Sequence, residues 1–201
     1  MCAAKNNETA VPESRRSARD RIFEAAKDLF YRHGIRAVGV ESIACEADAT
    51  KMTLYRNFNS KDELVAACMR DHDRDFWAWW DSVLAPHTGD PQAQLMALMA
   101  AFSHQCEEQP RGCPMLNAVV ELQEEDHPGR AVIVQNKLRI RERLSALCRE
   151  IEAHDPDTLA DALYLLIEGA YISLLVLKGS DTPAEALPRI AETLIAAHIE
   201  Q

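Results

Sequence analysis

The segment that decides the fold is residues 18–64, which read ARDRIFEAAKDLFYRHGIRAVGVESIACEADATKMTLYRNFNSKDEL. Its first third carries apolar side chains three and four residues apart, a spacing that places them on one face of a helix. This spacing predicts a helix from Ala18 to His33, which Gly34 can end because glycine readily takes a positive φ. The apolar face consists of Ile22, Ala25, Ala26, Leu29 and Phe30.

Two shorter helices with a tight turn between them follow in the same segment. The first is expected over 40–47, and the turn lies at Asp48 and Ala49. Thr50 is a suitable N-cap for the second helix, which reaches Asn57. Two short helices joined in this way form a helix-turn-helix, whose second helix enters the major groove of DNA.

The spacing of the residues across this segment resembles the DNA-binding module of the TetR-type (tetracycline-repressor family) transcriptional regulators. The resemblance covers about 45 residues at fixed spacing. It implies a homodimer that binds a double-stranded, palindromic DNA operator and leaves it when a small molecule binds elsewhere in the chain. The matching residues are Arg21, Ile22, Phe23, Glu24, Ala25, Ala26, Leu29, Phe30, Gly34, Ile43, Ala44, Ala47, Thr53, Leu54, Tyr55, Phe58, Ser60, Lys61, Asp62, Glu63 and Leu64.

Six side chains in and beside the second short helix have the chemistry that DNA contact requires. Arg56 can pair with guanine and Asn57 with adenine, while Thr53 offers a hydroxyl and a methyl group to phosphate or thymine. The resemblance implies that the Tyr55 hydroxyl and the Lys61 ammonium meet phosphates. The predicted DNA-binding residues are therefore Lys51, Thr53, Tyr55, Arg56, Asn57 and Lys61.

Three residues depart from the family pattern. Asp48 stands where the family usually has glycine in the turn, and Asp tolerates the left-handed backbone region better than most residues. Gly39 replaces a hydroxyl residue that caps the first short helix, which puts one phosphate contact in doubt. Glu41 would repel phosphate, so we expect it to point away from DNA or to select against some sequences.

The charge is divided unevenly along the chain. The formal net charge is 22 − 32 = −10, which by itself argues against a nucleic-acid partner. Residues 1–61, however, contain 11 Lys and Arg against 8 Asp and Glu, or +3, which leaves −13 for residues 62–201. This asymmetry indicates that the front of the chain meets a polyanion.

The whole sequence predicts an all-α fold of about nine helices, since no stretch shows sustained alternation of apolar and polar residues. We expect a flexible arm over 1–15, a three-helix DNA-binding domain over 16–62, and a helical ligand-binding and dimerisation domain over 63–201. Ser60, followed three residues later by Glu63, has the capping-box pattern that opens the next helix.

The dimer interface is expected on the last two helices, over 157–178 and 183–199. The first of these is apolar nearly all round, so one face can fill the core while another meets a partner. The predicted interface residues are Leu163, Ile167, Ala170, Leu174, Ile190 and Leu194.

An effector of unknown identity is expected in the second domain. Aromatic and methionine side chains suit an apolar pocket, and a few polar residues there can orient a ligand. The predicted ligand-binding residues are Trp77, Phe102, Cys106, Met115, Asn117, Tyr164 and Glu168. An alternative is a redox- or electrophile-sensing repressor that acts through Cys106 or Cys113, because Arg111 lies beside the thiols.

The sequence points to a cytoplasmic protein without cofactor, metal or membrane partner. The first 14 residues lack an apolar signal-peptide core, and the longest charge-free apolar stretch, 170–177, is short for a membrane span. The six scattered cysteines are expected as free thiols. A helical enzyme or a pure interaction module remains the alternative of another class, although no catalytic motif is present.

Overall fold

The computed structural model describes residues 17–108, 111–177 and 182–199, and every regular element in these ranges is a helix. The predicted flexible arm, including Cys2, lies outside them. The elements in chain order are α1 (Ala18–His33), α2 (Val40–Glu46), α3 (Lys51–Asn57), α4 (Lys61–Leu84), the 3₁₀ turn η1 (Ala85–His87), α5 (Pro91–Glu108), α6 (Pro114–Glu121), α7 (Pro128–Glu150), α8 (Pro156–Leu177), the 3₁₀ turn η2 (Pro183–Ala186) and α9 (Leu187–Ile199).

Local capping explains where the first helices begin. The Thr50 hydroxyl accepts a hydrogen bond from the backbone N–H of Thr53 at 3.1 Å, and Ser60 accepts one from Glu63 at 3.0 Å. Asp48 has a φ of +47°, so it takes the left-handed conformation expected of the turn between α2 and α3. Gly39 precedes α2 without a side-chain cap, as expected.

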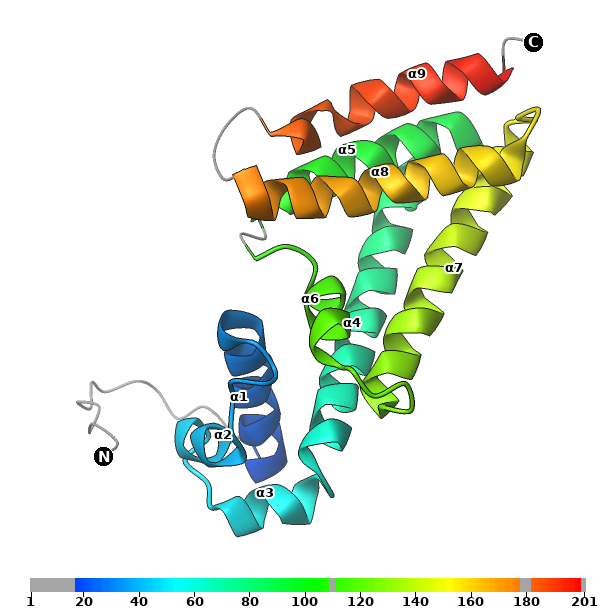
Figure 1. The fold of residues 1–201 in the computed structure, drawn as a ribbon. Helices are drawn as coiled ribbons and strands as arrows, with labels where there is room; N and C mark the ends of the chain where they lie inside the picture. Colours follow the sequence, from blue (N-terminus) through cyan, green and yellow to red (C-terminus); the bar gives the residue numbers. More distant parts are fainter. Residues whose placement is uncertain (1–16, 109–110, 178–181, 200–201) are drawn as a thin grey trace, which may run out of the picture.

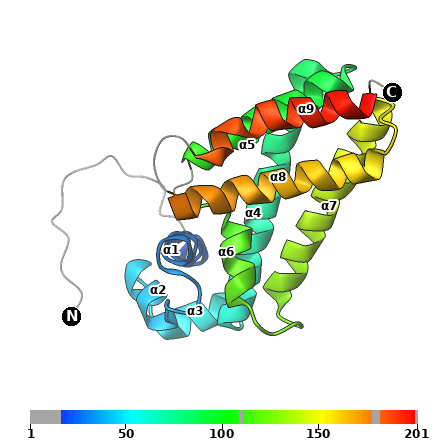
Figure 2. The same cartoon turned by 45° about the horizontal axis from the view of Figure 1, so that its top comes forward.

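The helices form two groups that share α4 (Figures 1 and 2). Helices α1, α2 and α3 pack around the beginning of α4, with Ile22, Ile43 and Leu54 fully buried between them. Farther along, α4 packs against α7 and α5, while α8 and α9 lie across the far end. Because α4 is continuous across the expected boundary at residue 62, any shift of α4 acts on both groups.

Two predicted helix ends are corrected. The sequence pattern predicts a helix from Met115 to about Glu125, but helix α6 stops at Glu121, because the backbone of Leu122 leaves the helical region (φ −87°, ψ 89°). The last predicted helix begins as η2, and α9 proper starts at Leu187.

Two other expectations also change. Cys45 is disulfide-bonded, so the expectation of free thiols, which rested on compartment alone, holds only for Cys68, Cys106, Cys113 and Cys148 among the described cysteines. Helix α8 is long and apolar enough to cross a membrane by length and composition, although the stretch 170–177 by itself is not. Only 33% of its most apolar window is buried in the protomer, so α8 carries uncovered apolar surface.

Candidate DNA-binding, effector and dimer surfaces

The outward face of α3 is formed by four exposed side chains. Leu54 is fully buried against the other helices of the group, whereas Lys51, Met52, Tyr55 and Arg56 are exposed. Sequence reasoning missed Met52, which is 67% exposed and next to Lys51 at the start of the helix. Its position one turn before Arg56 could have indicated that it shares the outward face. A thioether there offers apolar contact to a thymine methyl group.

The other three predicted DNA-binding residues are held by bonds within the group. Thr53 lies 2.9 Å from the hydroxyl of Thr50, and the Asn57 amide donates to the Thr53 carbonyl at 2.8 Å. The Lys61 ammonium donates to the Ile35 carbonyl at 2.5 Å, and its partial burial lowers the pKa of Lys61. To reach DNA, each of these groups must exchange or share its present partner.

The first residue of α3 is paired with the acidic residue that departs from the family pattern. Lys51 donates to Glu41 at 2.5 Å, and this hydrogen bond lowers the pKa of the Glu41 carboxyl and raises that of Lys51. Glu41 therefore does not point away from the recognition helix. It neutralises one cation on the face that we expect to meet phosphate.

We predict that Glu41→Ala strengthens DNA binding several-fold at low salt, because it frees Lys51 for a phosphate. Each neutralised phosphate adds about 0.9 to the slope of log affinity against log salt, so this slope should steepen by roughly that amount. Fluorescence anisotropy over a salt series measures both quantities. The gain should shrink in a Lys51→Ala background, and an equal gain there would contradict this reading.

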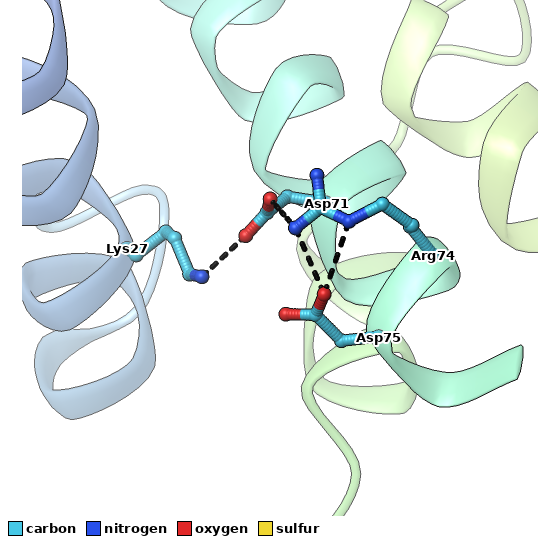
Figure 3. Close-up of polar contacts among 4 residues, drawn as sticks. All are labelled: Lys27, Asp71, Arg74 and Asp75. Atoms are coloured by element: carbon cyan, nitrogen blue, oxygen red, sulfur yellow. Dashed lines mark hydrogen bonds and ion pairs between the residues drawn. The ribbon is translucent and has the colours of Figure 1, made fainter. Parts of the chain in front are cut away.

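An ion-pair network joins α1 to α4 (Figure 3). The Lys27 ammonium pairs with Asp71, which also accepts from Arg74 one turn later. Arg74 in turn pairs with Asp75 at 2.8 Å. Burial alone would raise the pKa of Asp71, but the hydrogen bonds from Lys27 and Arg74 outweigh it and lower the pKa.

Helix α6 forms a second link to the same group. A Glu121 oxygen accepts a hydrogen bond from the backbone N–H of Arg36 at 2.7 Å. Gly34, with a φ of +86°, lets the chain pass so close that an added Cβ would lie 2.9 Å from Glu121. A cavity of about 520 Å³ lies between α1, α4 and α6, and the predicted ligand residue Asn117 lines it.

A smaller cavity of about 240 Å³ lies inside the second group of helices, between α4, α5, α7 and α8. One wall is aromatic, and the other carries charged and amide groups. Phe76, Trp79 and Phe102 form one cluster, with ring centroids 5.0 to 6.3 Å apart, and Tyr171 meets Phe102 edge-on. The Tyr171 hydroxyl donates to Gln105 at 2.6 Å.

The charged wall centres on Lys137 and Glu168, which pair at 2.6 Å and are each only 16% exposed. The Lys137 ammonium also lies 3.9 Å from the Cys113 sulfur. Desolvation by burial would lower the pKa of Lys137, but Cys113 and Glu168 outweigh it and raise the pKa. The second carboxylate oxygen of Glu168, Oε2, is buried and accepts no hydrogen bond of normal geometry from any residue that the structure describes, although the Tyr164 hydroxyl interacts with this carboxylate.

The structure brings only part of the predicted ligand set to this cavity. Phe102, Met115 and Glu168 line it, whereas Trp77, Cys106, Asn117 and Tyr164 do not. The Trp77 indole instead donates to Asp73 at 2.9 Å and stacks under Arg139, with the guanidinium 4.1 Å from the ring centroid.

The lining residues that sequence reasoning missed include Phe76, Trp79 and Lys137. Lys137 lies one turn from the buried Ile133 and Ile140, a position that could have indicated an inward direction. His72 also lines both cavities, and its burial lowers its pKa.

The exposed apolar surface of α8 forms a stripe. Leu165, Gly169, Ile172 and Val176 follow one another at spacings of four, three and four residues, and all are exposed. A Cβ added at Gly169 would meet nothing within 4 Å. On the neighbouring α9, Ile190 and Ile199 are 39% and 38% exposed.

Three of the six residues predicted for the dimer interface lie in the core of the protomer instead. Leu163, Ile167 and Ala170 lie in the core of their own protomer, at most 5% exposed, so they are unavailable to a partner. Leu174 and Leu194 are half-buried, and Ile190 is exposed as the prediction requires.

Comparison with known proteins agrees with this architecture over both groups of helices. The family described as "Bacterial regulatory proteins, tetR family" matches residues 22–68, and "Tetracyclin repressor-like, C-terminal domain" matches residues 91–190. The chain belongs to the TetR family. It is thus a DNA-binding transcriptional regulator and not an enzyme. The helix-turn-helix assigned from the sequence is confirmed.

Solved TetR-family regulators share the fold over nearly the whole chain. SCO4454 from Streptomyces coelicolor superposes with a TM-score of 0.82 at 25% identity and covers 90% of this chain and 96% of its own. A regulator from Streptomyces avermitilis, sav143, gives 0.77 at 28% identity, with 91% and 98% covered. The curated repressor SCO4008 from S. coelicolor is 36% identical over 84 residues, which span 36% of this chain and only 43% of that protein.

Proposed function

We propose that this TetR-family chain is a ligand-responsive transcriptional repressor that binds a palindromic operator as a homodimer in the cytoplasm. Residues 16–62 form the DNA-binding domain, and residues 63–201 bind the effector and the second protomer. The observation that carries the proposal is the continuity of α4, which lines the effector cavity with His72 and Asp75 and bonds to α1 through Asp71.

The effector acts by a shift of α4. A ligand in the 240 Å³ cavity contacts Asp75, whose neighbour Arg74 also holds Asp71. A ligand that fits better when α4 is displaced favours the displaced state, and the two α3 helices of the dimer then lose the spacing of the half-sites. The ligand-free form is the one that binds DNA.

The first test is a selection from random-sequence DNA with the full-length protein. We expect enrichment of one palindrome with two half-sites about one helical turn apart, and binding that weakens steeply with salt. Enrichment of no sequence would overturn the repressor proposal.

We predict that Lys27→Met weakens operator binding about three- to tenfold, because α1 loses its ion pair with α4 and the pre-set position of α3 relaxes. Fluorescence anisotropy measures the affinity. Arg32→Met is the matched control, since it also removes one positive charge from α1 but breaks a pair with Asp28 inside the same helix. Equal losses in both variants would show that charge alone matters.

A second candidate, electrophile sensing, is favoured by one contact. Cys113 lines the effector cavity, and its sulfur lies 3.9 Å from the Lys137 ammonium. Reactive thiols in proteins are commonly found beside a cation. The cation beside this thiol is thus Lys137, whereas the sequence suggested Arg111. The thiolate would add to the β-carbon of an unsaturated carbonyl compound, forming a C–S bond while the α-carbon takes a proton from water. Cys106 is fully buried and does not line this cavity.

We predict that N-ethylmaleimide modifies Cys113 before the other three cysteines that remain in a Cys2→Ser/Cys45→Ser background. Burial raises the pKa of Cys68 and Cys148 to about 12, which leaves little thiolate there at neutral pH. Peptide mass spectrometry over time identifies the site, and anisotropy reports whether DNA is released. If Cys113→Ser leaves the modification rate and the DNA response unchanged, electrophile sensing is excluded.

A further inference from the structure

The effector cavity is lined by Glu168, one of whose carboxylate oxygens lacks a well-formed hydrogen bond. Of the two Glu168 oxygens, Oε1 is held by Lys137 at 2.6 Å, while Oε2 is buried and accepts no hydrogen bond of normal geometry from the described residues. The Tyr164 hydroxyl interacts with the same carboxylate, and burial together with Glu168 raises the pKa of Tyr164. A buried polar atom without a partner costs about 1–3 kcal/mol relative to one that is satisfied. A ligand that supplies an N–H or O–H to Oε2 recovers this cost, whereas one without a donor does not.

The charge of this carboxylate is already balanced. The Lys137 ammonium is in contact with it, and Asp75, the other carboxylate of the lining, is paired with Arg74. A second cation beside Glu168 would lie close to the Lys137 ammonium and be repelled. The unsatisfied oxygen therefore favours a neutral hydrogen-bond donor over an ammonium group.

The aromatic wall opposite Glu168 determines which ring system the cavity can hold. Phe76, Trp79, Phe102 and Tyr171 present aromatic rings to a space of about 240 Å³. A cavity of about 150 Å³ lined by apolar residues holds benzene, so this one has room for a substituted ring or two fused rings. Aromatic side chains pack well on such flat ligands in offset or edge-on arrangements.

We propose that the effector is a small, neutral aromatic molecule with a hydroxyl or amine donor, of the phenol or arylamine class, that hydrogen-bonds to Oε2 of Glu168. This inference rests on the proposed function for the identity of the site. The aromatic wall holds the ring, the free carboxylate oxygen takes the donor, and Lys137 keeps the carboxylate in place.

The test compares two probes that differ only in the donor, 2-naphthol and 2-methoxynaphthalene, by isothermal titration calorimetry on the full-length protein without DNA. We expect wild type to bind 2-naphthol about tenfold or more tightly, as one hydrogen bond to a charged group implies. The double variant Lys137→Met/Glu168→Leu removes the pair without leaving a buried charge, and it should bind both probes alike. Tyr164→Phe is the control for the neighbouring hydroxyl and should retain the preference.

The outcomes separate this inference from the proposed function. Equal affinity of wild type for the two probes, no binding of either, or a preference that persists in the double variant would overturn the inference. If the preference is present but 2-naphthol leaves the operator complex intact in anisotropy, the ligand class stands and the release mechanism fails. If compounds that carry no donor for Glu168 release the DNA, the repressor proposal is supported and the proposed ligand class is wrong.

Discussion

Ile172→Asp should convert the protein from a dimer to a monomer and reduce operator binding by 100-fold or more. Ile172 lies in the middle of the exposed stripe on α8, between Gly169 and Val176, and is 49% exposed in the protomer. A carboxylate there would be desolvated in a two-fold interface opposite its own copy, which is strongly unfavourable. Because the side chain contributes little to the protomer's own core, the fold should persist.

The measurement is light scattering after size exclusion, with circular dichroism to confirm the helices and anisotropy for DNA. A monomer retains only half-site binding, which is why the expected loss in affinity is large. Leu138→Asp is the matched control, since Leu138 is a similarly exposed leucine, 57% exposed, on α7 rather than on the α8 stripe. A dimer that survives Ile172→Asp, or a monomer produced equally by Leu138→Asp, would place the interface elsewhere.

The stripe also shows where sequence reasoning reached its limit. Local patterns located the early helices well, because caps and apolar periodicity act within a few residues: α1 and α3 have the predicted ends, and Thr50 and Ser60 cap as expected. Helix α8 is apolar nearly all round, so its sequence contains no sign of which face is inward. The choice of Leu163 over Leu165 was therefore undetermined, and packing against α5, α7 and α9 decides it.

The effector cavity was difficult to predict for a related reason. A pocket forms where side chains from several helices converge, and its composition depends on helix rotations of a few tens of degrees. Trp77 and Trp79 are two residues apart on α4, yet only Trp79 lines the cavity. Lys137 belongs to a run of basic residues with Arg139, Arg141 and Arg143, a pattern that by itself predicts a solvent-exposed helix face. Residues two apart on a helix point in nearly opposite directions, so Lys137 faces inward while Arg139 is exposed.

The Lys137–Glu168 pair leads to the second large effect, which is on stability. Lys137→Met should lower the free energy of unfolding by about 3 kcal/mol, because it leaves the Glu168 carboxylate buried without a counter-charge. The double variant Lys137→Met/Glu168→Leu should recover most of this loss, since a buried ion pair can be replaced by apolar groups of similar volume at little net cost. Urea unfolding at one fixed protein concentration measures the difference, as dimerisation makes stability concentration-dependent.

Arg141→Met provides the control on the same helix. It breaks the Arg141–Asp161 pair between α7 and α8, which is solvent-exposed, so its removal should change stability little. If Lys137→Met and Arg141→Met are equally mild, Glu168 is satisfied by solvent, and its Oε2 atom has no need of a ligand donor. If the single variant is costly and the double variant is not, the pair adds little net stability. In that case, the role of the Lys137–Glu168 pair beside the aromatic cavity is to bind the effector rather than to stabilise the fold.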